Sequence, residues 1–107
     1  MTPVSREVLK LLRRFDVLTK QAAYGGWHIA RVRREYRETY GDWYLNDPSR
    51  QTIRVTEAMM SRVLERGYVV LSELPGRATD TTEAAFTVSL TDEGRAALAV
   101  DMLRWRR

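Results

Sequence analysis

The chain has 107 residues, 44% of them hydrophobic and 30% charged, which is the balance of a water-soluble globular domain. It has no cysteine, and this excludes a disulfide framework and a thiolate metal site. The net charge of +4, carried by arginine except at Lys10 and Lys20, favours polyanionic partners such as nucleic acid.

The apolar runs of the chain are too short to span a membrane. The first stretch, "MTPVSREVLKLLRR", has charged residues among its apolar ones, which a signal-peptide core does not. We therefore expect a cytoplasmic protein with one domain over residues 1–107 and no membrane partner.

The first predicted element is a helix over about residues 3–22. Thr2 suits the capping position and Pro3 the first helical position. Apolar residues then recur at steps of four and three, which marks one buried face, and Gly25-Gly26 ends the element. The residues of this apolar stripe are Val4, Val8, Leu11, Phe15 and Leu18, widened by Leu9 and Leu12.

Residues 27–46, "WHIARVRREYRETYGDWYLN", fit two structures. The interpretation we prefer is a helix to about Thr39, because Ile29, Val32, Tyr36 and Tyr40 would share one face. Ion pairs would then join Arg31 to Glu35 and Arg34 to Glu38. The alternative is a β-hairpin that turns at "YGD" and returns through 43–45. A short strand is expected over 52–55.

The second half of the chain gives a clearer pattern. Thr56 suits an N-cap, and "EAMMSRVLERG" is an amphipathic helix that ends at Gly67. A strand over 68–74, a polar loop over 75–83 and a return strand over 84–90 follow. A last helix runs from Asp92 to about Trp105. The residues expected to point inward are Met59, Met60, Val63 and Leu64 on the first of these helices and Leu98, Met102 and Trp105 on the last.

Two motifs in this half resemble winged-helix transcriptional regulators of the MarR and PadR type. They are "RVLERGYV" (62–69) and "VSLTDEGRAAL" (88–98), in which Leu90, Thr91, Gly94 and Arg95 fit the pattern Leu-Thr-x-x-Gly-[Arg/Lys]. The resemblance covers the chain from about Val55 to Leu98. It implies an α+β fold: a winged helix-turn-helix, mainly helical, with a two- to three-stranded antiparallel β-wing.

The resemblance also implies a function. The chain would be a small sequence-specific DNA-binding protein, a bacterial or phage transcriptional regulator that reads double-stranded DNA as a homodimer. The Thr56 helix would enter the major groove, and the 75–83 loop would meet phosphate or the minor groove. The predicted DNA-contacting residues are Arg54 just before the helix, Thr56, Glu57, Ser61 and Arg62 on the helix, and Arg77, Thr79 and Thr81 on the loop.

A second hypothesis keeps the fold but not the DNA. Aromatic residues crowd the middle of the sequence, and a protein partner would use part of this set, with Trp43 and Tyr44 as the partner-binding residues. The chain would then be a winged-helix interaction module, such as a phage-encoded inhibitor or an assembly subunit. The competing interpretation of these aromatics is hydrophobic core.

The sequence offers no catalytic constellation. His28 is the only histidine, and the acidic residues lack metal-ligand spacing. No serine stands in a nucleophile motif, and no glycine-rich loop is present that would cradle a phosphate. We therefore expect no enzyme activity, no metal and no cofactor.

Overall fold

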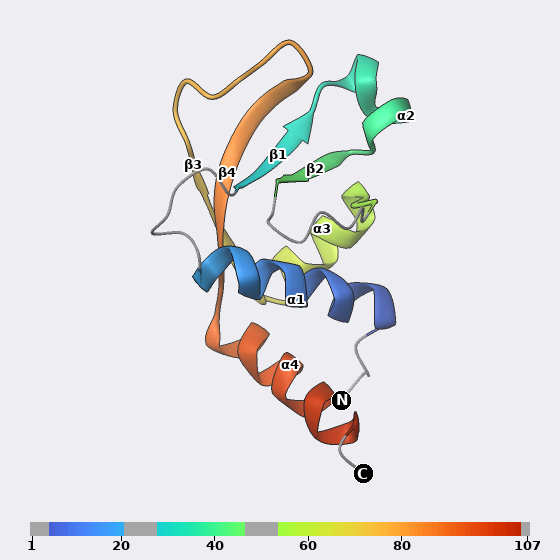
Figure 1. Ribbon diagram of the computed structural model, residues 1–107, viewed down its shortest axis with the longest axis vertical. Helices are drawn as coiled ribbons and strands as arrows, with labels where there is room; N and C mark the ends of the chain where they lie inside the picture. The colour runs from blue at the N-terminus through green and yellow to red at the C-terminus, as the bar shows by residue number, and fades with distance from the viewer. Residues whose placement is uncertain (1–4, 21–27, 47–53, 106–107) are drawn as a thin grey trace.

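Four helices of the α type and a four-stranded antiparallel sheet make up the part of the chain that the computed structural model describes, which is residues 5–20, 28–46 and 54–105 (Figure 1). This is the α+β class expected from the sequence. In chain order the elements are α1 (Arg6–Lys20), β1 (His28–Val32), the 3₁₀ turn η2 (Arg34–Tyr36), α2 (Arg37–Tyr40), β2 (Trp43–Asn46), α3 (Glu57–Glu65), β3 (Val69–Glu73), β4 (Thr82–Leu90) and α4 (Asp92–Trp105).

The sheet has the strand order β2-β1-β4-β3, so the long strand β4 pairs with β1 of the first hairpin and with β3 of its own hairpin. Its first half pairs with β1, with Phe86 opposite Ile29. Its second half pairs with β3, with Leu90 opposite Val69. The β3–β4 hairpin expected from the sequence is therefore present, but the sheet has four strands instead of the expected two or three, because β1 and β2 join it.

One face of the sheet carries the hydrophobic core. Helix α1 crosses this face in front of β4, and α4 lies below α1 (Figure 1). The predicted apolar stripe of α1 is confirmed where it is described, since its members are almost fully buried. They pack with Met60 and Val63 of α3, Val88 and Leu90 of β4, and Leu98 of α4. These α1 residues are Val8, Leu11, Leu12, Phe15 and Leu18.

The preferred helix over residues 27–39 is wrong at 28–32, where the hairpin alternative is correct, but the helical turns η2 and α2 (residues 34–40) join the two strands in place of a tight turn at "YGD". Residues 28–32 form β1, and the chain returns through β2 with Ala30 opposite Tyr44. Ile29 faces the core, while Ala30 and Val32 are also buried although they point to the other face of the sheet. A strand buried on both faces loses the alternation that marks most strands, and the spacing of Ile29 and Val32 then imitates a helix.

The predicted limits of α3 are confirmed. The Thr56 side chain accepts a hydrogen bond of 3.2 Å from the Met59 amide, as an N-cap does. Gly67 follows the helix with a φ of 69°, a left-handed conformation that glycine adopts without steric cost. Met60 and Val63 point inward and Met59 is half-buried, but the prediction for Leu64 is wrong, because Leu64 is 40% exposed.

Three expectations fall wholly or partly outside the described residues. They are the helix start at Thr2–Val4, the stop at Gly25-Gly26 and the first half of the 52–55 strand. Of that strand, Val55 forms a single β-bridge with Trp43. Met102 and Trp105 lie in α4, but only their backbone is described.

The two motifs that carry the resemblance meet in space. The Thr91 hydroxyl donates to the carbonyl oxygen of Gly67, and its oxygen accepts from the Gly94 amide at 3.1 Å. The Thr91 amide donates to the Tyr68 carbonyl at 3.0 Å. These hydrogen bonds join the end of α3 to the start of α4. The β3–β4 hairpin begins and ends at this junction.

Candidate nucleic-acid interface

The outward face of α3 displays part of the predicted DNA-contacting set. Arg62 is exposed and Ser61 is half-buried, while Arg54 is exposed just before the helix. Thr56 is half-buried because its hydroxyl caps the helix. Arg66, also exposed, adds a positive charge that the sequence prediction did not include. Glu65 offsets one of these charges, so the face is mixed rather than uniformly basic.

Glu57 has internal partners for its carboxylate. The indole Nε1 of Trp43 donates to Glu57 Oε2 at 3.0 Å, and Arg31 lies 3.7 Å from the same oxygen. The Glu57 amide donates to Asp42 Oδ2 at 2.7 Å. A carboxylate held against Trp43 and Arg31 is turned toward the β1–β2 hairpin. Glu57, which the sequence predicts to contact DNA, therefore has partners within the protein, although its side chain is 49% exposed.

Arg31 is the centre of a charged cluster on the sheet. Its guanidinium lies 5.6 Å from the centre of the Trp43 ring, within the range of a cation–π contact. Its Nε lies 2.9 Å from Glu83 Oε1, close enough for an ion pair although the N–H lacks hydrogen-bond geometry. Arg37 reaches the same oxygen at 3.4 Å. Arg31 therefore pairs across strands instead of with Glu35, because the segment is a strand and not a helix.

The β3–β4 loop (residues 74–81) holds the rest of the predicted set. Arg77 is exposed at its tip. The Thr79 hydroxyl accepts from the amides of Thr81 and Thr82 at 3.3 and 3.0 Å, which folds the loop into a tight turn. Arg33 anchors this turn, since its Nε donates to the Thr79 carbonyl at 3.0 Å. Thr79 and Thr81 thus shape the loop, and Arg77 is its exposed cationic side chain.

The structure corrects one of the two predicted partner-binding residues. Trp43 is only 5% exposed and packs against Phe86, with ring centres 5.9 Å apart. A side chain in this position has no surface to offer to a partner. Tyr44, its neighbour on β2, points to the opposite face of the sheet and is 49% exposed.

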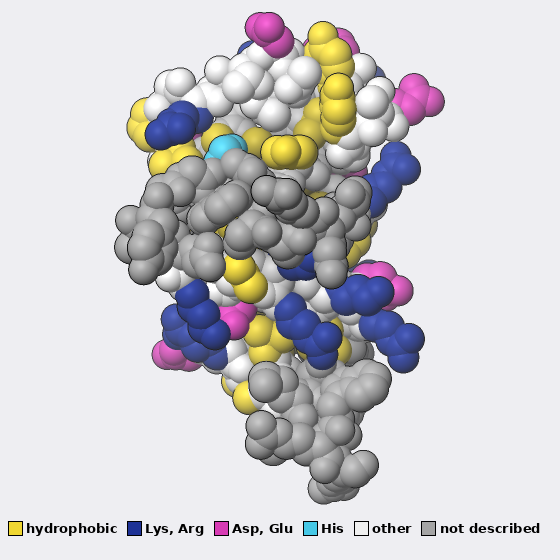
Figure 2. Space-filling view, viewed as in Figure 1, with side chains coloured by type: hydrophobic (Ala, Val, Ile, Leu, Met, Phe, Trp, Pro, Cys, Tyr) yellow, Lys and Arg dark blue, Asp and Glu magenta, His cyan; other side chains and the backbone are white. Residues whose placement is uncertain are grey.

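Sequence reasoning gave the outward face of α1 no function. Figure 2 shows lysine and arginine side chains gathered over α1, with a few acidic ones among them. The four-then-three spacing of Arg6, Lys10 and Arg13 is the signal that identifies this face, because it repeats the period of the apolar stripe on the other side of the helix. The basic residues of α1 are Arg6, Lys10, Arg13, Arg14 and Lys20, and the acidic ones are Glu7 and Asp16, of which Asp16 pairs with Lys20.

No helix in the described ranges combines the length and apolar character needed to cross a lipid bilayer. The same ranges hold no cluster of histidine, aspartate and glutamate that would bind a metal ion. Comparison of the chain with known protein families, curated proteins and solved structures gave no significant match.

Proposed function

We propose that this protein binds double-stranded DNA through α3 and the β3–β4 loop, as a small winged-helix regulator would. The single observation that carries the proposal is the hydrogen bond from Thr91 to Gly67, which joins the end of α3 to the base of the β3–β4 hairpin. A helix that inserts into a groove and a loop that meets the flanking backbone must keep a fixed relative position. The strand order β1-β4-β3 behind α3 supports the same arrangement.

The contact set that we propose is smaller than the set predicted from sequence. Arg62 would hydrogen-bond to guanine in the major groove, and Arg54 and Arg77 would contact phosphates or the minor groove. All three side chains are exposed. Because Glu57 is held by Trp43 and Arg31, its negative charge is partly offset within the protein and does not stand alone opposite the DNA backbone.

A homodimer would place two copies of α3 on the two halves of a palindromic site. Helix α4 is the element that we propose for this contact, because Val100 is 46% exposed beside Ala96 and Ala99 on its outer side. Light scattering of the free protein and of its DNA complex measures this state directly. A complex with one chain per duplex would contradict the dimer.

The test of the proposal is selection of duplexes from a random-sequence library at about physiological salt, where nonspecific binding is weak, with affinities of about 10⁻⁴–10⁻⁶ M. The wild type should enrich a defined sequence. Arg62→Ala should lose preference at one base position, whereas the matched control Arg95→Ala on α4 should enrich the same sequence. Recovery of unenriched library by the wild type would contradict sequence-specific binding.

One observation favours a second candidate, a protein-interaction module. Tyr36, Tyr40 and Tyr44 are exposed large side chains on one side of the β1–β2 hairpin, and the Tyr36 and Tyr40 rings lie 6.4 Å apart. Exposed tyrosines are enriched at binding surfaces. If this candidate is correct, a pull-down should recover a stoichiometric protein partner with the wild type and with the α3 variant Arg62→Ala. The partner should be lost with Tyr36→Ser.

A further inference from the structure

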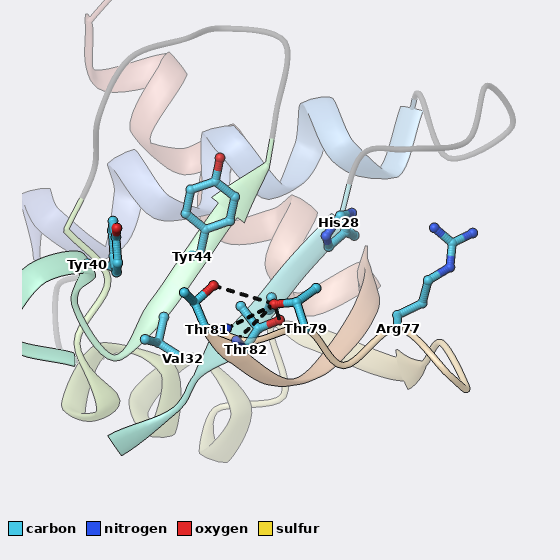
Figure 3. A pocket seen from close by; sticks show the side chains of 9 residues that line it. His28, Val32, Tyr40, Tyr44, Arg77, Thr79, Thr81 and Thr82 are labelled. Atoms are coloured by element: carbon cyan, nitrogen blue, oxygen red, sulfur yellow. Dashed lines mark hydrogen bonds between the residues drawn. The ribbon is translucent and has the colours of Figure 1, made fainter. Parts of the chain in front are cut away.

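A cavity of about 320 Å³ lies between the β3–β4 loop and the face of the sheet opposite the core (Figure 3). Ala30 and Val32 of β1 form its floor, and both are buried. Ala30 leaves this space open because its side chain is a single methyl group between Tyr44 on β2 and Ala85 on β4. The cavity is separate from the outward face of α3.

The walls of the cavity differ in chemistry. Tyr40 and Tyr44 stand on one side, as Figure 3 shows, and each has about half of its surface exposed. Thr79, Thr81 and Thr82 line the other side, joined by hydrogen bonds among their own hydroxyls and amides. His28 and Arg77 complete the lining, and Arg77 extends away from the threonines. No acidic side chain of the described residues lines this cavity.

Each lining group favours one part of a ligand. Tyrosine rings over an apolar floor suit a flat ring, since every such ring has a face that stacks on an aromatic. A threonine hydroxyl has one proton and two lone pairs, so Thr81 and Thr82 keep capacity for the polar edge of that ring. Arg77 without an opposing carboxylate suits an anionic group, and phosphate is an anion that arginine binds with two parallel hydrogen bonds.

The size of the cavity limits the ligand further. Its volume lies at the lower end of the roughly 300–1,000 Å³ typical of small-molecule sites, so a single ring system with one short substituent would fill it. A planar base, a sugar and one phosphate match the size of the cavity. They also match its lining, which has the tyrosines toward one end and Arg77 at the other. We propose that this cavity binds a mononucleotide, with the base against Tyr40 and Tyr44 and the phosphate at Arg77. The proposal does not depend on DNA binding by α3.

The experiment is a titration of the isotope-labelled full chain, followed by amide chemical shifts, with AMP, GMP, CMP and UMP as probes. At least one nucleotide should shift the amides of Ala30, Val32 and Thr82 with a Kd below about 1 mM, which is a weak but specific affinity. The matching nucleoside should bind several-fold more weakly, because it lacks the phosphate. Inorganic phosphate should not shift Ala30 or Val32, since it has no ring to occupy the floor.

Substitutions test which residues of the cavity bind the base and which bind the phosphate. Ala30→Leu fills the floor and should weaken nucleotide binding by about tenfold or more. Arg77→Gln should weaken the nucleotide but not the nucleoside, and Arg95→Gln on α4 is the matched loss of charge that should change neither. If Ala30→Leu does not fold, Thr81→Leu at the wall replaces it and should give the same loss.

Several results would overturn the proposal. One is the absence of shifts at Ala30 and Val32 with every nucleotide at several millimolar. Another is equal shifts of Ala30 and Val32 with inorganic phosphate, which would show that the site recognises only negative charge. A third is unchanged affinity in a folded Ala30→Leu or Thr81→Leu variant.

Discussion

The Thr91 hydroxyl donates a hydrogen bond to the carbonyl oxygen of Gly67 across a sequence separation of 24 residues. The Thr91 hydroxyl oxygen also accepts a hydrogen bond from the Gly94 amide and so caps α4. One side chain thus ends one helix, begins another and sets the direction of the hairpin between them. The residues Leu-Thr-x-x-Gly form a motif for this reason, since the threonine and the glycine act at the same contact.

Replacement of Thr91 by alanine should lower the free energy of unfolding by about 1–3 kcal/mol, because it removes an N-cap and leaves the Gly67 carbonyl without its hydroxyl donor. Thr91→Ser keeps the hydroxyl and should recover most of this loss. Urea denaturation measures both. Equal stability of the alanine and serine variants would show that the hydroxyl does not join the two helices.

Gly94→Ala should destabilise the protein, which is the opposite of its usual effect inside a helix. A Cβ at this position would overlap the Tyr68 carbonyl oxygen and approach Leu90 Cδ2 to 2.9 Å. We expect a loss of about 2–4 kcal/mol, in the range of overpacked sites. The matched control is Ala96→Gly on the exposed side of α4, which should cost only about 1 kcal/mol. A more stable Gly94→Ala variant in thermal unfolding would contradict the close approach of α4 to Tyr68.

Thr19 connects α1 to the end of β4 in a similar way. Its hydroxyl donates to the Phe15 carbonyl at 2.8 Å and accepts from the Leu90 amide at 3.0 Å. Thr19→Val keeps the shape of the side chain but leaves the Leu90 amide without an acceptor, and should cost about 1–2 kcal/mol in denaturant unfolding. Thr87→Val, on the same strand, should change stability by less than about 0.5 kcal/mol. Similar losses in the two variants would argue against the α1–β4 contact.

Glu57→Gln tests the contacts of the Glu57 carboxylate with Trp43 and Arg31. The glutamine keeps an oxygen near Trp43 Nε1 but removes the charge that faces Arg31. If DNA binding is correct, the enriched duplex sequence should stay the same, and affinity should rise modestly as one negative charge is lost. Selection experiments with the variant and the wild type measure this. A changed base preference would return Glu57 to the set of base-reading residues.

The sequence predicted most correctly where one face of an element is buried and the other is exposed. The buried face of α1 is predicted on this basis, whereas the cap at Thr56, the stop at Gly67 and the start of α4 at Asp92 are predicted from the residues at the helix ends. The structure confirms all four. Leu64 is the exception on α3, because an apolar residue at the edge of a helical stripe can remain half in water at little cost.

The β1–β2 hairpin shows why the rest was harder to predict. Ala30 and Val32 are buried under neighbouring elements on the side where a surface strand would carry polar residues. Trp43 is buried by contacts with Arg31 across the hairpin and with Phe86, which lies far from it in the sequence. Neither kind of burial produces a recognisable pattern in the neighbouring sequence. The ion pair of Arg31 with Glu83 and the cavity beneath the β3–β4 loop have the same origin, because strand pairing brings their residues together.

We propose that α3 and the β3–β4 loop together form the surface that contacts DNA. The most direct measurement is a map of amide chemical-shift changes when a selected duplex is added to the full chain. The changes should concentrate at residues 54–66 and 74–82 and weaken with added salt. Changes confined to the basic face of α1 at Arg6, Lys10 and Arg13, with α3 and the loop unaffected, would contradict it.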